Sequence, residues 1–178
     1  MGYAERDAVQ RYSEMDKAID TVCHAHRDPA YLDQTDRRLL RLVAEDCSRS
    51  YAELGRLLNL SPSTVHERVK RLKRERVILG THARLDARRV GRALLAFVLV
   101  TTDGVASTRR LLALSSHQDI EEIHAVAGDS AVMLKARTRD TEALEELLAC
   151  IEAIEGVQGT RSYIVLSSYL ERGPSPEL

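Results

Sequence analysis

The hydrophobic periodicity of this chain changes near residue 91, and that change restricts the possible folds more than any other feature. Before it, apolar residues recur at spacings of three and four in short segments, which is typical of amphipathic helices. After it, a continuous apolar run over residues 94–100 begins an alternation of strand-like and helix-like segments. The sequence therefore predicts an α+β protein with a helical first domain and a mixed second domain.

Charge is divided along the chain at nearly the same place. Residues 34–92 carry fifteen Lys or Arg against seven Asp or Glu, a net charge of +8, although the whole chain of 178 residues has a net charge of only −1. Residues 1–33 have a net charge of −3 and residues 93–178 one of −6. A basic module joined to an acidic one indicates that only one half of the protein meets a polyanion.

Three short helices are predicted between residues 33 and 75. Asp33 can cap the first, and Ser50 begins a Ser-x-x-Glu capping box at the start of the second. Ser61 and Pro62 begin the third, as the N-cap and the first helical residue. A helix, a short turn and a second helix make a helix-turn-helix unit.

The third of these helices has the pattern of a DNA-recognition helix. Val65, Val69 and Leu72 fall within about 60° of one another on a helical wheel and predict a buried stripe. The opposite face is polar and cationic, which suits base edges and phosphates in a major groove. From their places in the helix we expect base contacts by Ser63, Thr64, His66, Glu67 and Lys70, and phosphate contacts by Ser61, Arg68, Arg71, Lys73, Arg74 and Arg76.

The chain is long enough for two domains, whose bounds follow from these patterns. The alternating segment Thr-His-Ala-Arg-Leu at 81–85 predicts a short strand, and with it a small wing. The predicted parts are an N-terminal helical extension at 1–31, a winged helix-turn-helix domain at 32–82, a linker at 83–92, a second domain at 93–170 and a disordered tail at 171–178.

The second domain reads as a ferredoxin-like βαββαβ unit. Strands are predicted at 94–100, 120–127, 131–138 and 163–170, and helices at 105–117 and from residue 140, with Gly156 as a left-handed helix end. The first strand is apolar on both of its faces, so the sheet face without helices must also be covered. A second copy of the same sheet is the simplest cover, and we expect a homodimer.

Several motifs occur in a fixed order along residues 32–170. They are Leu32-Asp33-x-x-Asp36-Arg37-x-Leu39-Leu40, Glu53-Leu54, Leu60-Ser61-x-Ser63, Arg68-Val69-x-Arg71-Leu72, Val77-Ile78 and Leu85-Asp86-x-x-x-Val90-Gly91, with Gly128-Asp129 and Gly156-Val157 further on. In this combination the chain closely resembles the Lrp/AsnC, or feast/famine, family of transcription regulators. The resemblance implies a winged helix-turn-helix that binds double-stranded promoter DNA. It also implies a ferredoxin-like (RAM) domain that builds dimers and often octamers, and small-molecule effectors, commonly amino acids, between dimers.

The chain departs from that family at two places. Family members commonly have glycine at the position of Arg76, and we expect arginine there to strain the helix end or to strengthen phosphate contact. The family's effector turn usually reads Gly-x-Tyr-Asp. The resemblance places the effector site at Gly128, Asp129, Ser130 and Ala131, where the aromatic residue and the carboxylate are missing. We therefore expect a weak response, or none, to common amino acids.

Two other functions compete with DNA-binding regulation. Some sirohaem decarboxylases resemble the same two-domain family and use histidines of the second domain, which keeps His117 and His124 of interest. An architectural protein that compacts DNA is the other alternative. The sequence has no phosphate-binding loop and no nucleophile motif, so we expect neither an enzyme nor a cofactor.

The remaining signals are weak. Apolar residues of the N-terminal extension recur at spacings of three and four and predict an amphipathic helix of about five turns, with a disordered tail as the alternative. The Cys23-His24-x-His26 motif lacks a fourth ligand, and the three cysteines are far apart, so neither a metal site nor a disulfide framework is supported. No apolar run approaches the ~20 residues needed to cross a bilayer, and we expect a cytoplasmic protein.

Overall fold

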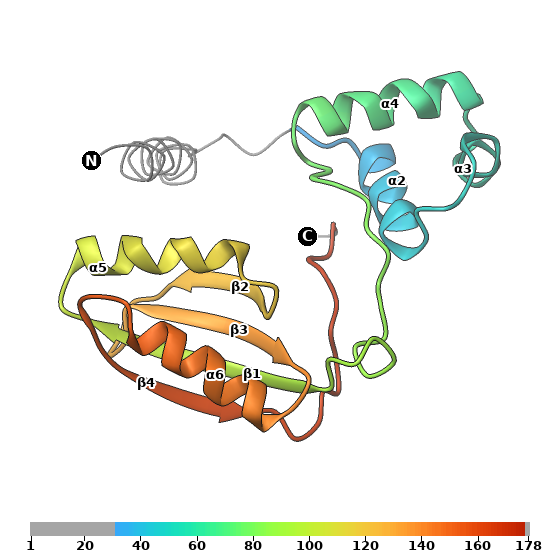
Figure 1. Cartoon of the computed structure of the whole chain (residues 1–178). Coiled ribbons are helices and arrows are strands. Elements are labelled where there is room, and N and C mark those ends of the chain that lie inside the picture. The colour runs from blue at the N-terminus through green and yellow to red at the C-terminus, as the bar shows by residue number, and fades with distance from the viewer. Residues whose placement is uncertain (1–30, 177–178) are drawn as a thin grey trace, which may run out of the picture. The chain divides into compact units, whose positions relative to one another are not determined.

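The computed structural model describes residues 31–176. These residues form two compact units, one of residues 31–82 with 174–176 and the other from Ala83 to Gly173 (Figure 1). The predicted extension over 1–31, including its Cys23-His24-x-His26 motif, lies outside the described residues apart from Tyr31.

The first unit contains three helices packed around one apolar core, as predicted. They are α2 (Gln34–Glu45), α3 (Tyr51–Leu58) and α4 (Pro62–Arg74). Six fully or nearly fully buried aliphatic side chains form the core: Leu39, Leu54, Leu58, Val65, Val69 and Leu72. The predicted buried stripe of the third helix is confirmed, because three of these six residues belong to it.

Side-chain caps set the beginnings of all three helices. The Asp33 carboxylate accepts a hydrogen bond of 2.7 Å from the backbone N–H of Asp36, whose own carboxylate accepts one from Asp33, and this completes a capping box. The hydroxyls of Ser50 and Ser61 accept from backbone N–H groups in the first turns of α3 and α4, at 3.2 and 3.1 Å. The three predicted N-caps are thus confirmed.

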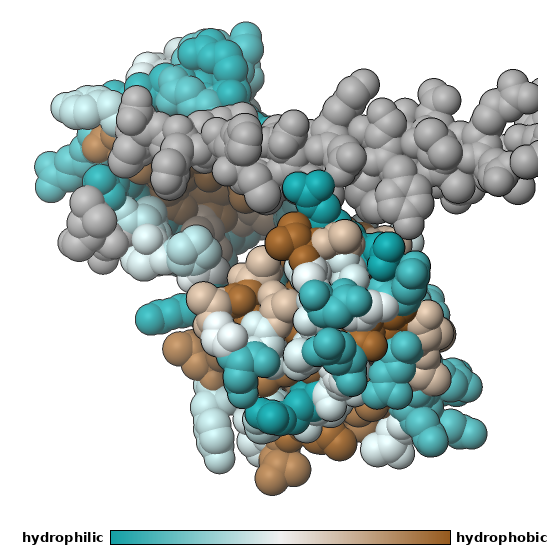
Figure 2. Space-filling model, turned by 90° about the vertical axis from the view of Figure 1, so that its left-hand side faces the viewer, coloured by the Kyte–Doolittle hydropathy of each residue, from teal (hydrophilic) through white to brown (hydrophobic). Residues whose placement is uncertain are grey.

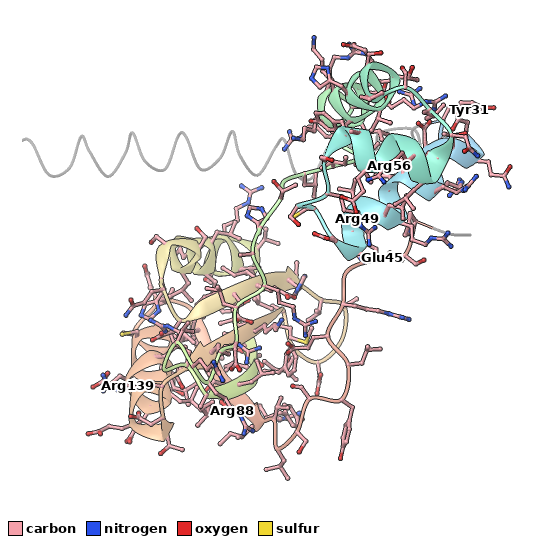
Figure 3. All side chains as sticks on the ribbon, turned by 90° about the vertical axis from the view of Figure 1, so that its right-hand side faces the viewer. Tyr31, Glu45, Arg49, Arg56, Arg88 and Arg139 are labelled. Atoms are coloured by element: carbon pink, nitrogen blue, oxygen red, sulfur yellow. The ribbon has the colours of Figure 1, made fainter. Side chains whose placement is uncertain are left out.

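A backbone carbonyl oxygen in the last turn of α2 accepts a hydrogen bond from an arginine in the connection to α3. The Arg49 guanidinium donates to the carbonyl oxygen of Leu42 at 3.0 Å and lies 3.6 Å from the carboxylate of Glu45 (Figure 3). A cation at the carboxyl end of a helix also interacts favourably with the helix dipole.

The turn between α3 and α4 depends on two residues with special backbone requirements. Asn59 ends α3 in the left-handed conformation, with φ of 55°, and asparagine tolerates this better than most residues. A side chain on Gly55 would bring its Cβ within 2.6 Å of the Leu60 carbonyl oxygen. The turn therefore passes α3 so closely that only glycine fits at this position.

The predicted strand at 81–85, and with it the wing, is wrong. No strand occurs in the described residues before β1, and Leu85 is 68% exposed. An alternating pattern favours a strand only where another strand can pair with it, and this segment has no such neighbour. A turn follows instead, in which the Asp86 carboxylate accepts from the backbone N–H groups of Arg88 and Arg89.

The second unit has the predicted βαββαβ order. Its elements are β1 (Leu94–Thr102), α5 (Val105–Arg110) continued by the 3₁₀ helix η1 (Leu111–Ser116), β2 (Ile120–Ala125), β3 (Val132–Thr138), α6 (Thr141–Glu152) and β4 (Val157–Ile164). The four strands form an antiparallel sheet in the order β2-β3-β1-β4. Side chains of η1 and α6 pack with the inward residues of β1 and β3 and form the core of this unit.

The other face of the sheet carries large side chains without a helix over them. Phe97 and Leu99 of β1 point to this face and are only half-buried, whereas Val98 and Val100 on the core face are fully buried. Phe97 is paired across the sheet with Lys135 of β3 on one side and with a tyrosine of β4 on the other. This chain alone therefore leaves an apolar strip along the middle of its sheet.

The last strand lies earlier than predicted. A strand was predicted at 163–170, but β4 runs from Val157 to Ile164. The later segment is the more apolar one, yet Leu166, Tyr169 and Leu170 are 91%, 96% and 70% exposed. An edge strand that covers the core with one face needs fewer apolar residues, so the more polar segment could take this place.

The turn before β4 contains the predicted left-handed glycine. Gly156 has φ of 87°, although α6 already ends at Glu152, earlier than predicted. A Cβ on Gly156 would lie only 2.6 Å from the Cβ of Ser107. Residues 171–176, part of the tail predicted to be disordered, have no regular secondary structure, and Glu171 forms an ion pair of 3.1 Å with Arg137.

Candidate nucleic-acid interface

Helix α4 presents a continuous polar face opposite its buried stripe. Val65 and Leu72 are completely buried and Val69 is 6% exposed. The residues predicted to contact bases (Ser63, Thr64, His66, Glu67 and Lys70) are all exposed, as are Lys73, Arg74 and Arg76 of the predicted phosphate contacts. The surface of the helical unit where α4 lies is correspondingly hydrophilic (Figure 2).

The other two arginines predicted to contact phosphate have carboxylate partners inside the unit. Arg68 Nη1 lies 2.7 Å from Asp33 Oδ2 and 2.7 Å from Asp36 Oδ1. Arg71 Nη2 binds the second carboxylate oxygen of Asp36. The Asp36 side chain is completely buried. A phosphate would have to compete with Asp36 for these guanidinium groups. The exposed cations of α4 outside this cluster are Lys70, Lys73 and Arg74, and only a surface contact of 4.0 Å links Arg74 to Glu75.

This ion cluster ties the recognition helix to α2. The hydrogen bond from Arg68, followed by that from the backbone N–H of Asp36, lowers the pKa of the Asp33 carboxyl. The hydrogen bonds from Arg68 to the carboxylates of Asp33 and then Asp36 raise the pKa of Arg68. A buried carboxylate needs such partners, since an unpaired charge in the interior is strongly destabilising.

The sequence contains a signal for this cluster, although Asp36 is not among the site residues predicted above. Asp36 lies on the same helical face as Leu39, Leu40 and Val43, at spacings of three, four and seven. A carboxylate on an apolar stripe predicts a buried cationic partner. Arg68 lies at the edge of the buried stripe of α4, where such a partner is expected.

Hydroxyl groups cluster at the beginning of α4. Ser61 Oγ lies 2.9 Å from Ser63 Oγ and 2.7 Å from Thr64 Oγ1, and all three residues are exposed. Ser61 is already engaged as the N-cap, whereas Ser63 and Thr64 project from the first turn. These groups can each donate or accept a hydrogen bond, which suits the mixed edges of base pairs.

His66 is held from the side by an aromatic residue of α3. The centroids of the Tyr51 and His66 rings are 5.2 Å apart, and the rings are inclined by 53°. His66 Nδ1 also lies 3.6 Å from the carboxylate of Glu67. Tyr51 is not among the site residues predicted from the sequence.

An arginine whose backbone has the left-handed conformation follows the end of α4. The backbone N–H of Val77 donates to Leu72 at 2.9 Å and that of Arg76 to Lys73 at 3.0 Å, the two hydrogen bonds of a Schellman motif. Arg76 has φ of 58°, a conformation that favours glycine. The strain expected at this position is therefore present, and the arginine side chain is exposed.

The four predicted effector residues lie together in the β2–β3 hairpin of the second unit. The backbone N–H of Val126 donates to Ala131 at 3.0 Å and closes the loop. The Asp129 side chain is 76% exposed and lies 3.5 Å from Arg161 of β4, which is not among the site residues predicted from the sequence. Ser130 and Ala131 are half-buried.

The two histidines of the enzyme alternative are each engaged locally. His117 Nδ1 accepts from the backbone N–H of Asp119 at 3.2 Å, and His124 Nε2 lies 2.9 Å from Glu122. The contacts from His124 and then Lys135 lower the pKa of the Glu122 carboxyl. Within residues 31–176 no three potential metal ligands gather, and no helix there is long and apolar enough to span a membrane.

Three helices with an exposed cationic third helix, followed by a βαββαβ unit, define a helix-turn-helix protein with a ferredoxin-like second domain. Family models agree with this class: the AsnC-type helix-turn-helix domain matches residues 32–73 and the Lrp/AsnC ligand binding domain matches residues 95–175. The chain belongs to the Lrp/AsnC family of transcriptional regulators.

Individual relatives match nearly their whole length. The HTH-type transcriptional regulator FL11 of Pyrococcus abyssi is 31% identical over 145 residues, 82% of this chain and 96% of the relative. The structure of E. coli AsnC superposes with a TM-score of 0.76 at 26% identity, covering 82% of this chain and 99% of that one. A feast or famine regulatory protein from M. tuberculosis complexed with L-methionine gives a TM-score of 0.74 at 34% identity, covering 79% and 96%.

Proposed function

We propose that this regulator binds promoter DNA as a homodimer through α4 and that a small molecule bound at the β2–β3 hairpin modulates it. The proposal that the protein binds DNA rests on one observation, namely that α4 has a buried side and an exposed side. Its buried stripe and the Asp36–Arg68 ion pair fix one side of the helix, and the other side is exposed and polar. Fixed side chains on a rigid helix can discriminate between base edges.

Within α4, position along the helix separates two roles. Residues near the amino end of a recognition helix reach base edges, so base reading is assigned to Ser63, Thr64, His66, Glu67 and Lys70. The exposed cations at and beyond the last turn (Lys73, Arg74 and Arg76) are assigned to phosphates, which contribute affinity without sequence preference.

The dimer follows from the uncovered face of the sheet. Phe97 and Leu99 are half-buried there, and the neighbouring Lys135 and Arg137 are each paired with glutamates. A second copy related by a two-fold axis would bury the apolar strip and leave the ion pairs around it. Such a dimer also presents two α4 helices to two half-sites, and its association into octamers is part of the proposal.

The effector site is proposed at the hairpin that contains Gly128, Asp129, Ser130 and Ala131. Its polar groups include the paired Asp129 and Arg161, which could bind a ligand with both charges. One structural relative is complexed with L-methionine. Because Ala131 stands where the family's turn usually has a carboxylate, the response of this chain to common amino acids is proposed to be weak.

Selection of bound duplexes from random DNA tests the proposal. The full-length protein is expected to enrich a sequence with two half-sites related by two-fold symmetry, separated by about one helical turn of 10 base pairs or a multiple of it. Light scattering of the free protein should give the mass of a dimer or a multiple of it. Binding without any enriched sequence would contradict base reading and favour a DNA-compacting role.

A further inference from the structure

The inward stripe of α3 ends in an aromatic residue at the surface. Tyr51, Leu54, Gly55 and Leu58 recur at spacings of three and four and face the rest of the unit. Leu54 and Leu58 are 2% and 6% exposed, but Tyr51, in the first turn, is 40% exposed. The tyrosine ring therefore lies where the core of the unit meets the exposed face of α4.

At this boundary the Tyr51 ring packs against His66. A centroid distance of 5.2 Å and an inclination of 53° fall within the range of favourable tilted aromatic pairs. The His66 side chain is still half exposed, so the contact leaves one side of the imidazole open. With Glu67 beside Nδ1, the nitrogen Nε2 is the one left to meet a partner outside the protein.

Tyr51 is placed by the capped first turn of α3 and by apolar neighbours on one side. The Ser50 cap sets the first turn of α3, and the tyrosine lines a hollow together with Leu54, Val69 and Lys73. An exposed histidine on a helix otherwise samples several rotamers, and ordering it on binding costs free energy. A ring packed against one side of the imidazole removes part of that cost.

We propose that Tyr51 is a positioning residue for base recognition, which holds the imidazole of His66 in the orientation that meets a base edge. Tyr51 thereby helps to set the sequence preference from α3 without reading a base itself. The inference rests on the proposed function, because it requires that α4 reads bases.

The test compares variants of the full-length protein on the selected duplex and on all its single-base variants. Tyr51→Leu and Tyr51→Ala are expected to reduce discrimination by about threefold or more at the same base positions as His66→Ala, which is the size of coupling typical for contacting residues. The Tyr51→Leu/His66→Ala double variant should discriminate as well as His66→Ala alone. Tyr51→Phe keeps the ring and should keep the wild-type preference.

Leu57→Ala is the matched control. Leu57 lies on α3 outside the inward stripe and is 48% exposed, so its removal should leave the base preference unchanged. Thermal unfolding of each variant checks the fold, and Tyr51→Leu retains apolar packing if the alanine variant fails to fold.

Three results would overturn the inference. The first is that Tyr51→Leu discriminates between bases as well as the wild type at the positions where His66→Ala discriminates less. The second is that His66→Ala discriminates between bases as well as the wild type. The third is that Tyr51→Leu binds every duplex more weakly by the same factor. If the unmodified protein shows no selective binding, the proposed function fails, and this distinguishes its failure from that of the inference about Tyr51.

Discussion

The completely buried carboxylate of Asp36 in α2 accepts a 2.7 Å hydrogen bond from the guanidinium of Arg68 in α4. The second oxygen of the same carboxylate binds Arg71. One side chain of α2 thus fixes two side chains of α4, and both lie on the same side of the apolar stripe of α4. The orientation of α4 is therefore determined by an ionic contact as well as by aliphatic packing.

Replacing Asp36 tests this contact. Asp36→Asn leaves two arginines without their carboxylate and should destabilise the protein by about 2 kcal/mol, the usual value for hydrogen bonds to charged groups. Urea unfolding measures the change. Glu45→Ala, also in α2 but exposed, serves as the control and should stay within about 0.5 kcal/mol of the wild type. An Asp36→Asn variant as stable as this control would show that the cluster does not hold α4.

The left-handed Arg76 predicts a stabilising substitution. The conformation costs a non-glycine residue roughly 1–2 kcal/mol, part of which the larger entropy of glycine in the unfolded chain offsets, so Arg76→Gly should stabilise by about 0.5–1 kcal/mol. Arg74→Gly, two residues earlier within α4, should instead destabilise by about 1 kcal/mol. Equal effects of the two substitutions in urea unfolding would contradict the assigned helix end.

Acid stability should depend on Asp33. The pKa of this carboxyl is lowered in the folded protein, chiefly by Arg68, from its ordinary value of 3.8. The folded state therefore gains stability from the ionised form above pH 3.8, and this gain is lost as the pH falls below that value. Asp33→Asn keeps an N-cap without the charge, so its stability should fall less steeply between about pH 4 and 2.

Unfolding followed by helix circular dichroism across this pH range measures that difference. Asp129→Asn removes an exposed carboxyl from the other unit and should leave the slope unchanged. An Asp33→Asn profile parallel to the wild type would contradict the ion pair with Arg68.

Amino acids should bind weakly, if at all, to the β2–β3 hairpin proposed as the effector site. No thermal shift is expected with common amino acids at sub-millimolar concentration, because Ser130 and Ala131 replace the aromatic residue and the carboxylate of the family's turn. The Ser130→Tyr/Ala131→Asp variant restores that turn and should gain a shift with at least one amino acid. A clear shift of the unmodified protein would contradict this account of the site.

The sequence predicted those parts of the fold that depend on local chemistry. Ser61 and Pro62 mark the start of α4 because a cap and a fixed φ act within one turn, and the buried stripe follows from helical spacing alone. The wing and the position of β4 were wrong because strand formation depends on a partner strand, which local patterns do not identify. Leu166 and Tyr169 made the later segment look like a buried strand, yet both are exposed.

Among the candidate site residues, the exposed face of α4 was predicted, but the pairing of its arginines was not. The carboxylate of Asp36 on an apolar stripe signals a buried cationic partner, yet only the positions of the side chains in space show that Arg68 is that partner and that Lys73 stays exposed. Tyr51 was missed for a similar reason, since its contact with His66 joins two helices at an angle that the sequence does not specify.

The most direct test of DNA recognition by α4 compares two variants over a salt titration, on the selected duplex and on a shuffled one. Lys73→Ala/Arg74→Ala should weaken binding to both and lower the salt slope by about 0.9 for each phosphate that is no longer neutralised, whereas Glu67→Ala should change base preference with little change of slope. Arg139→Ala, in the second unit, controls for charge. Wild-type affinity, slope and base preference in both α4 variants would contradict the account.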